Sequence, residues 1–149
     1  MAEISASIDI NESPESVWRV LMALEAWPEW SPLFQMMRLH DPSVGIAGGF
    51  SAHGLLGRVP YSAEFMVPDY EPLKRFVFET VTISTPYNVL WHDVRMNGST
   101  LRWTTTYTNS GGPGGLLVDR LLIRRHAQTL IERQLAALAE RVTSANRVG

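Results

Sequence analysis

The chain has 149 residues and a formal net charge of −2. Hydrophobic residues make up 45% of it and charged residues 19%, which is the composition of one ordinary folded domain rather than a disordered chain. The charge argues against a nucleic-acid partner, and the absence of cysteine excludes disulfides, thiol catalysis and thiolate metal sites.

The first elements predicted are one strand and two short helical segments. Ile4, Ile8 and Ile10 lie on one side of an alternating pattern, which predicts a strand with one buried face. Ser13 and Pro14 suit the N-cap and first position of a helix. Two prolines and two tryptophans within residues 27–32 predict a short second helix or a turn.

Six further strands are predicted, because turn residues interrupt the sequence at short intervals. Asn97 and Gly98 form the strongest of these signals, since Asn-Gly favours a two-residue hairpin loop. The predicted strands are 33–41, 47–55, 59–68, 73–82, 86–96 and 99–108.

A long amphipathic helix is predicted over residues 116–145, a stretch without Gly or Pro. Its apolar residues recur every three or four positions, which is typical of a helix with one buried face. Gly111–Gly115 precedes it as a hinge, and we hypothesise that this hinge lets the start of the helix move as a gate. The fold class predicted is α+β. It is a single domain over residues 1–149 in which a curved antiparallel sheet of about seven strands wraps around the helix and leaves an internal cavity.

This order of elements, with Trp27-Pro28-Glu29-Trp30 after the first helix, resembles the helix-grip proteins of the START-like superfamily. Within that superfamily the chain is most similar to the polyketide cyclase/dehydrase and lipid-transport group. Three further segments have a similar sequence pattern: Gly57-Arg58-Val59, Pro86-Tyr87 with Leu90-Trp91-His92, and residues 98–103. The resemblance implies a hydrophobic pocket for a polyketide, lipid or aromatic molecule, and, in aromatase/cyclases, catalysis of cyclisation and dehydration.

The Asn97-Gly98 loop predicts which side chains face the pocket. It places His92 opposite Trp103, Leu90 opposite Thr105, and Asn88 opposite Tyr107. His92, with Tyr107, is a candidate for general acid/base chemistry, because an ordinary imidazole exchanges protons near neutral pH. A buried neutral histidine bonded to a neighbour is an equally reasonable interpretation of His92.

Arg58 is the third candidate catalytic residue. In aromatase/cyclases an arginine in this region is thought to hold the anionic oxygens of the substrate, and the resemblance implies this role here. A solvated arginine in a turn is the alternative interpretation. The predicted ligand-contacting residues are Tyr61, Phe65, Asn88, Leu90, Trp103, Thr105, Ile123, Ala127, Leu130 and Gln134.

Three functions remain open from the sequence: an enzyme, a non-catalytic carrier or sensor, and a protein-interaction domain that uses the helix and its arginines. No metal-ligand spacing is present, so we expect neither a metal site nor a cofactor. No signal peptide or membrane-spanning stretch is visible, so we expect a cytoplasmic monomer or homodimer without integral membrane contact.

Overall fold

The computed structural model describes residues 2–84, 87–109 and 123–148. Within them one seven-stranded antiparallel sheet has the strand order β1-β7-β6-β5-β4-β3-β2. The strands are β1 (Ala2–Asp9), β2 (Phe34–Leu39), β3 (Phe50–Leu56), β4 (Val59–Glu71), β5 (Arg75–Ile83), β6 (Tyr87–Asn97) and β7 (Thr100–Asn109). The helices are α1 (Pro14–Met22), the 3₁₀ turns η1 (Leu24–Glu29) and η2 (Gly45–Gly48), and α3 (Arg124–Val148).

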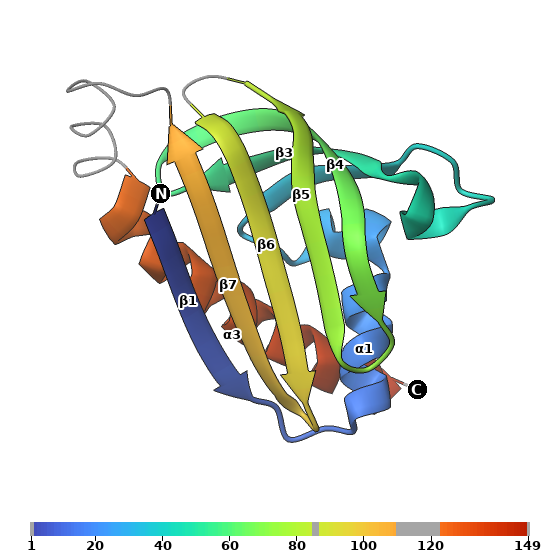
Figure 1. Cartoon of the computed structure of the whole chain (residues 1–149). Coiled ribbons are helices and arrows are strands. Elements are labelled where there is room, and N and C mark those ends of the chain that lie inside the picture. Colours follow the sequence, from blue (N-terminus) through green and yellow to red (C-terminus); the bar gives the residue numbers. More distant parts are fainter. Residues whose placement is uncertain (1, 85–86, 110–122, 149) are drawn as a thin grey trace.

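The sheet curves around α3, as Figure 1 shows. The predicted order of strand, two short helical segments, six strands and long helix is confirmed, and with it the helix-grip architecture. No pattern in the sequence predicted η2, a single turn inside a loop. The predicted hinge at residues 111–115 and the helix residues before 123 lie outside the described residues.

Helix α1 begins where the sequence predicts. The Ser13 hydroxyl accepts a hydrogen bond from the backbone N–H of Ser16 at 3.1 Å, and Pro14 occupies the first turn. Val17 and Leu21 are completely buried. The N-cap therefore fixes the helix start, and the apolar spacing fixes the face that turns inward.

The hairpin between β6 and β7 closes one residue later than predicted. Asn97 pairs with Thr100, so the loop is Gly98 and Ser99, and His92 lies opposite Thr105 rather than Trp103. Gly98 has a φ of 62° and Ser99 does not have a positive φ, which fits the type II′ hairpin with glycine in the first loop position. The predicted partners are thus wrong by two residues. Since side chains alternate with a period of two, the inward and outward sets are unchanged.

The prediction that Asn88 faces inward is wrong. The register of β6 against β7 shifts between Tyr87 and Val89, so Asn88 is an extra, unpaired residue in β6. Its side chain is exposed, whereas that of Tyr87 is buried. A bulge of this kind reverses the alternation of side chains beyond it, and the sequence carries no local signal for it.

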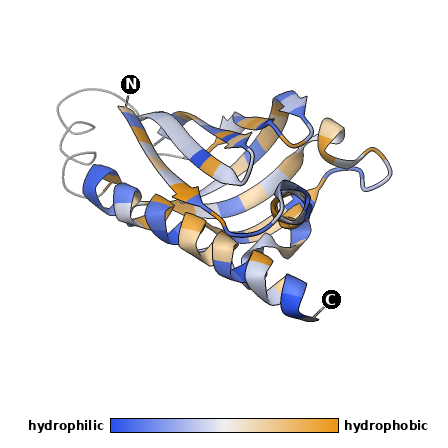
Figure 2. Ribbon diagram, turned by 90° about the horizontal axis from the view of Figure 1, so that it is seen from below, coloured by the Kyte–Doolittle hydropathy of each residue, from blue (hydrophilic) through white to orange (hydrophobic). Residues whose placement is uncertain are grey.

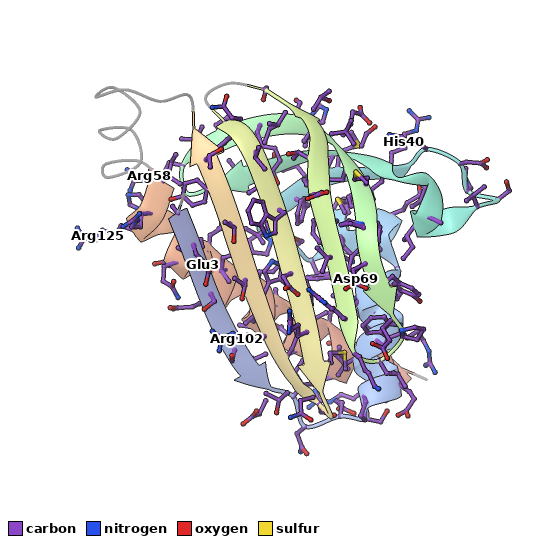
Figure 3. The ribbon with its side chains drawn as sticks, viewed as in Figure 1. Glu3, His40, Arg58, Asp69, Arg102 and Arg125 are labelled. Atoms are coloured by element: carbon purple, nitrogen blue, oxygen red, sulfur yellow. The ribbon has the colours of Figure 1, made fainter. Side chains whose placement is uncertain are left out.

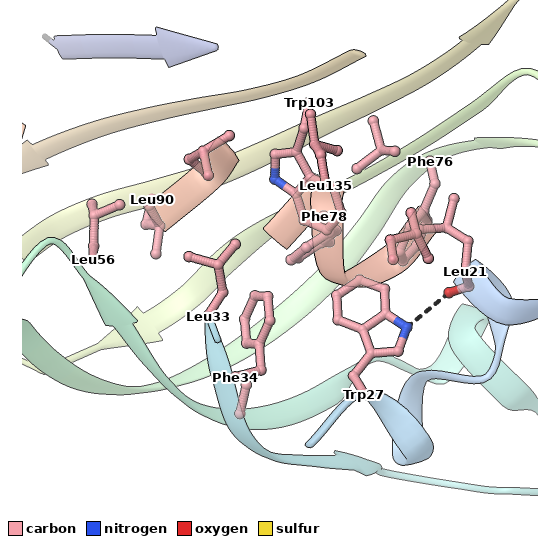
Figure 4. Packing of buried hydrophobic residues seen from close by; sticks show 14 of the residues in the cluster. Leu21, Trp27, Leu33, Phe34, Leu56, Phe76, Phe78, Leu90, Trp103 and Leu135 are labelled. Atoms are coloured by element: carbon pink, nitrogen blue, oxygen red, sulfur yellow. Dashed lines mark hydrogen bonds between the residues drawn. The ribbon is translucent and has the colours of Figure 1, made fainter. Parts of the chain in front are cut away.

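An aromatic cluster fills the space between the sheet and α3 (Figure 4). Trp27 of η1 is completely buried, and its ring centroid lies 5.3 Å from that of Phe34 and 5.6 Å from that of Trp103. Its indole N–H donates to the backbone carbonyl of Leu21 at 3.0 Å. Trp27 therefore packs η1 against β2 and against the inner face of β7.

Helix α3 supplies the opposite wall. Hydrophobic and hydrophilic residues alternate along it beneath the arch of the sheet (Figure 2). The residues buried on its inner side are Ile123 just before it, Ala127, Ile131, Gln134, Leu135, Leu138 and Val142. Because α3 contacts β1, β3, β7 and α1, its apolar face is covered along most of its length.

We predict that Gly54→Ala destabilises the protein by about 1–3 kcal/mol. A Cβ at Gly54 would lie 2.6 Å from the hydroxyl oxygen of Tyr61 and 2.9 Å from the backbone oxygen of Leu33, so β2 or β4 must shift. The control is Gly48→Ala, whose Cβ would come no closer than 3.6 Å to any neighbouring atom. The free energy of unfolding, measured in urea, should fall for the first variant only. Equal stabilities would contradict the packing described at Gly54.

Candidate functional site

Two polar side chains are buried in the apolar interior between the sheet and α3: His92 on β6 and Gln134 on α3. His92 is 1% exposed and Gln134 0% exposed. Each has one nitrogen that is buried and has no hydrogen-bond partner among the described residues, Nε2 in both cases. Buried polar atoms are nearly always paired, so two such atoms identify this region as the candidate site.

Trp103 fixes the tautomer of His92. The Trp103 indole N–H can only donate, and it donates to Nδ1 of His92 at 3.0 Å. Nδ1 must therefore carry a lone pair, which leaves the ring proton on Nε2. The Thr105 hydroxyl oxygen lies 2.8 Å from the same Nδ1. The neighbours on β7 thus occupy the acceptor of the ring and leave its donor free.

Burial lowers the pKa of His92 to about 3, because the interior penalises the imidazolium charge. At neutral pH the ring is neutral. The assumption of an ordinary histidine pKa, made from the sequence, does not hold at this position. His92 can donate a hydrogen bond from Nε2 to a carbonyl oxygen, but it is not a cationic acid.

Ser31 fixes the orientation of the Gln134 amide, because Ser31 has only its proton left to share with it. The Ser31 hydroxyl oxygen accepts from the backbone N–H groups of Leu33 and Phe34, at 3.1 and 3.2 Å. Its own proton is donated to Oε1 of Gln134 at 2.5 Å. The amide oxygen is engaged and the amide NH₂ is left in the interior. His92 and Gln134 therefore each present an unpartnered donor to the interior.

Aromatic rings surround the His92 imidazole. Ring centroids of Phe78, Phe34 and Trp103 lie 4.7, 5.7 and 5.8 Å from it. Neither unpartnered nitrogen has surface accessible to bulk solvent. A ligand can meet these donors only when the packed side chains separate.

Three buried tyrosines lie near the ends of β4, β6 and β7. The ring of Tyr87 packs edge-on against Tyr61 and Tyr107, with centroids 5.8 and 6.2 Å away. The Tyr87 hydroxyl donates to the backbone carbonyl of Leu56 at 3.0 Å. Burial raises the pKa of Tyr61 above its ordinary value, so its phenol stays protonated.

Arg58 is exposed in the turn between β3 and β4. Figure 3 places it at the end of the molecule where α3 begins, on the same side as Arg125. It shares no hydrogen bond or ion pair with His92 in the described part of the chain. The structure therefore separates these two candidate catalytic residues.

The remaining predicted residues are mostly inside. Tyr61, Phe65, Leu90, Trp103, Thr105, Tyr107, Ile123, Ala127 and Gln134 are buried, whereas Leu130 is half-buried. Four residues that contact them or His92 were not predicted as site residues from the sequence: Ser31, Phe34, Phe78 and Tyr87. Ser31 could not have been found from spacing, because it is 103 positions away from Gln134.

A second polar cluster lies on the outer face, where His40, Ser51 and Glu64 meet. Its composition resembles a catalytic triad, but Ser51 and Glu64 both contact the same nitrogen of His40, Nε2. A triad needs them on opposite nitrogens, so no proton can be relayed from serine to carboxylate through the ring. The pKa of Glu64 is lowered, chiefly by the hydrogen bond from Ser51. This cluster ties the loop after β2 to β3 and β4.

Two hollows lined by described residues lie at the surface. The larger, about 950 Å³, is formed by the β4–β5 and β6–β7 turns and the start of α1. Arg75 and Arg95 in its lining are already paired with Asp69 and Asp93. Residues 2–84, 87–109 and 123–148 contain no cluster of three or more His, Asp or Glu side chains suited to a metal ion. Nor do they contain a helix long and apolar enough to cross a membrane.

We predict that His92 makes the stability depend on pH below about 6.5. Its pKa is about 3 when folded and 6.5 in the unfolded chain, so between these values the unfolded state binds the extra proton and stability falls as the pH falls. From pH 7 to pH 5 this amounts to about 2 kcal/mol. Urea unfolding at both pH values should show that loss in the native chain relative to His92→Gln, which keeps an acceptor for Trp103. An identical pH dependence of the two proteins would contradict the prediction.

The chain matches the family described as polyketide cyclase / dehydrase and lipid transport over residues 1–143. A search of curated protein sequences gave no match. Among solved structures, protein TTHA0849 from Thermus thermophilus is similar at 18% identity with a TM-score of 0.78, over 97% of this chain and 99% of that one.

Two further solved structures share the fold. A START superfamily protein from Mycobacterium smegmatis is 13% identical with a TM-score of 0.72, over 96% of this chain and 98% of that one. Zhui aromatase/cyclase from Streptomyces sp. R1128 is 12% identical with a TM-score of 0.70, over 95% and 93%. These likenesses show the fold, and the match over residues 1–143 shows the family: the chain belongs to the polyketide cyclase / dehydrase and lipid transport family.

Proposed function

We propose that this protein binds an apolar small molecule that carries hydrogen-bond acceptors, in the space between the sheet and α3. The observation that supports this most is the pair of unpartnered donors, Nε2 of His92 and Nε2 of Gln134, in an otherwise apolar interior. An unpaired buried donor costs free energy, and a ligand oxygen removes that cost.

The chemistry of the donors selects the ligand. Trp103 occupies the acceptor nitrogen of His92, and Ser31 occupies one lone pair of the Gln134 amide oxygen, so the atoms of these two residues that lack a partner are donors. A ketone, quinone or ester oxygen finds a donor on either wall. The aromatic rings around His92 suit a flat or hydrocarbon body.

Membership of the family agrees with this proposal, since its description covers both cyclisation of polyketides and transport of lipids. A carrier needs only the apolar space and the donors. Binding is therefore the function that these residues support best.

The test is displacement of the fluorescent probe N-phenyl-1-naphthylamine by naphthalene and by 2-acetylnaphthalene, which differ by one acetyl group and hence by one carbonyl acceptor. We expect the ketone to bind about fivefold more tightly, since one net hydrogen bond contributes about 1 kcal/mol. In Gln134→Met, which keeps the length of the side chain but lacks the donor, this preference should shrink while naphthalene affinity persists. Gln128→Met on the same helix is the control, because Gln128 donates instead to the carbonyl of Ser5 at the edge of the sheet. Failure of all three compounds to bind would refute the proposed function.

Catalysis of cyclisation or dehydration is a second candidate, and one observation favours it. A neutral imidazole N–H held in a dry site can polarise a carbonyl and stabilise the enolate that forms from it. His92 would act in this way as a donor with buried Tyr107 in a supporting role, whereas exposed Arg58 would contact only a part of the substrate that reaches the surface.

A poly-β-ketone substrate separates the two candidates. If the protein is a catalyst, Arg58→Ala or His92→Gln should lower turnover at least tenfold while ligand affinity changes less. Product analysis by mass spectrometry measures the first quantity and probe displacement the second. Binding without turnover above the rate in buffer would leave the carrier function alone.

A further inference from the structure

Strands β5 and β6 separate before they end. Their pairing runs from Arg75 opposite Arg95 to Glu79 opposite Trp91. Beyond that point β5 continues to pair with β4 as far as Ile83, and β6 pairs with β7 from Tyr87 onward. Residues 80–83 and 87–90 therefore border a break in the pairing, which we call the β5–β6 seam. Figure 1 shows the two strands diverging toward this end.

Two bulges explain the seam. In β5 the register against β4 jumps from Thr82 to Thr80, so Val81 is left unpaired. In β6 the register against β7 jumps from Val89 to Tyr87, so Asn88 is left unpaired. A bulge bends its strand and increases its twist. Here the bulges lie on opposite sides of the seam, each against the outer neighbour, and the strands part between them.

In the described part of the chain one side-chain hydrogen bond crosses the seam, and where the seam ends the backbone N–H of Tyr87 donates to the carbonyl of Ser84 at 3.3 Å. The backbone N–H of Leu90 donates to the side-chain hydroxyl oxygen of Thr80 at 3.1 Å. Elsewhere between β5 and β6, opening the sheet would break consecutive backbone hydrogen bonds. Opening at the seam breaks this side-chain contact instead.

The side chains that border the seam differ between the two faces of the sheet. On the outer face Val81 is 64% exposed and Val89 38% exposed, which is unusual for neighbouring valines in central strands. On the inner face Tyr87 and Leu90 are buried. The Tyr87 side chain reaches from β6 to the end of β3 and is held there by the carbonyl of Leu56. The Tyr87 ring therefore covers the inner side of the seam, where it packs against Tyr61 and Tyr107.

We infer that the β5–β6 seam is the passage through which an apolar ligand enters and leaves the interior, with Tyr87 as its gate. This inference rests on the proposed function, because it assigns a route to the same ligand. The exposed side chains of Val81 and Val89 give an apolar ligand its first contact on the outer face. Tyr87, buried on the inner face, then lies between the ligand and the space beside His92. Because the interior donors are buried, a ligand reaches them only when the packing around them opens, and at the seam fewer backbone hydrogen bonds oppose this than in the paired part of β5 and β6.

Hydrogen exchange tests the seam without any ligand. In the unliganded protein, the backbone amide hydrogens of residues 80–83 and 87–90 should exchange with deuterium faster, on average, than those of residues 75–79 and 91–95 in the same two strands. Protection of the seam equal to that of the paired part would overturn the inference, because a passage must open more often than the ladder around it.

A cross-link tests whether ligands use the seam. The chain has no cysteine, so Val81→Cys with Val89→Cys can be joined across the outer face of the seam by a short bismaleimide, and mass spectrometry confirms the product. Stopped-flow fluorescence with N-phenyl-1-naphthylamine should then show association and dissociation rates at least tenfold lower, with Kd little changed. The control joins Ser5→Cys to Thr104→Cys, a directly paired position of β1 and β7, and should leave both rates unchanged.

Unchanged rates in the protein cross-linked across the seam would overturn the passage and leave ligand binding intact. Absence of probe binding to the protein before cross-linking would refute the proposed function, and the passage with it. Tyr87→Phe, which removes the hydroxyl held by Leu56 but keeps the ring, should raise both rates together. If it lowers affinity without changing the association rate, Tyr87 belongs to the wall and is not the gate.

Discussion

The burial of one face of α3 is the constraint on which the rest of the structure depends. A helix of this length with an apolar stripe has no stability in isolation, so its stripe needs a continuous partner surface. The concave side of the sheet supplies it, with Trp27, Phe34, Phe78 and Trp103 filling the space that curvature would leave empty. Where the helix and the sheet meet, both must present apolar side chains, and any polar group there has to be held by another.

His92 and Gln134 show how two polar groups persist in such an interior. Each has one side fully engaged, by Trp103 and by Ser31, and one donor left over. The engaged side determines which atom faces inward, because tryptophan can only donate and because Ser31, whose oxygen accepts from Leu33 and Phe34, donates its proton to Gln134. The neighbours of these residues, more than the residues themselves, decide the chemistry that the interior offers.

Closure and access place opposite demands on this fold. The aromatic packing that stabilises the protein also seals the donors from water and from ligands. Most of the sheet resists opening, since each central strand is bonded on both sides. The bulges at Val81 and Asn88 weaken one boundary between strands while leaving each strand bonded to its outer neighbour. A local defect of this kind can give access without loosening the core.

The sequence by itself determined the order of elements, the apolar faces of β1 and α3, the capped start of α1 and the inward set on β6 from Leu90 onward, because each follows from spacing and turn chemistry within a few residues. Only the tertiary structure decided the Gly98-Ser99 loop, the exposure of Asn88, and the roles of Ser31 and Tyr87. A register shift depends on how neighbouring strands bend together. The tautomer of His92 and the orientation of Gln134 depend on contacts with Trp103 and Ser31, and the second of these joins residues 103 positions apart, a relation that no periodicity in the chain encodes.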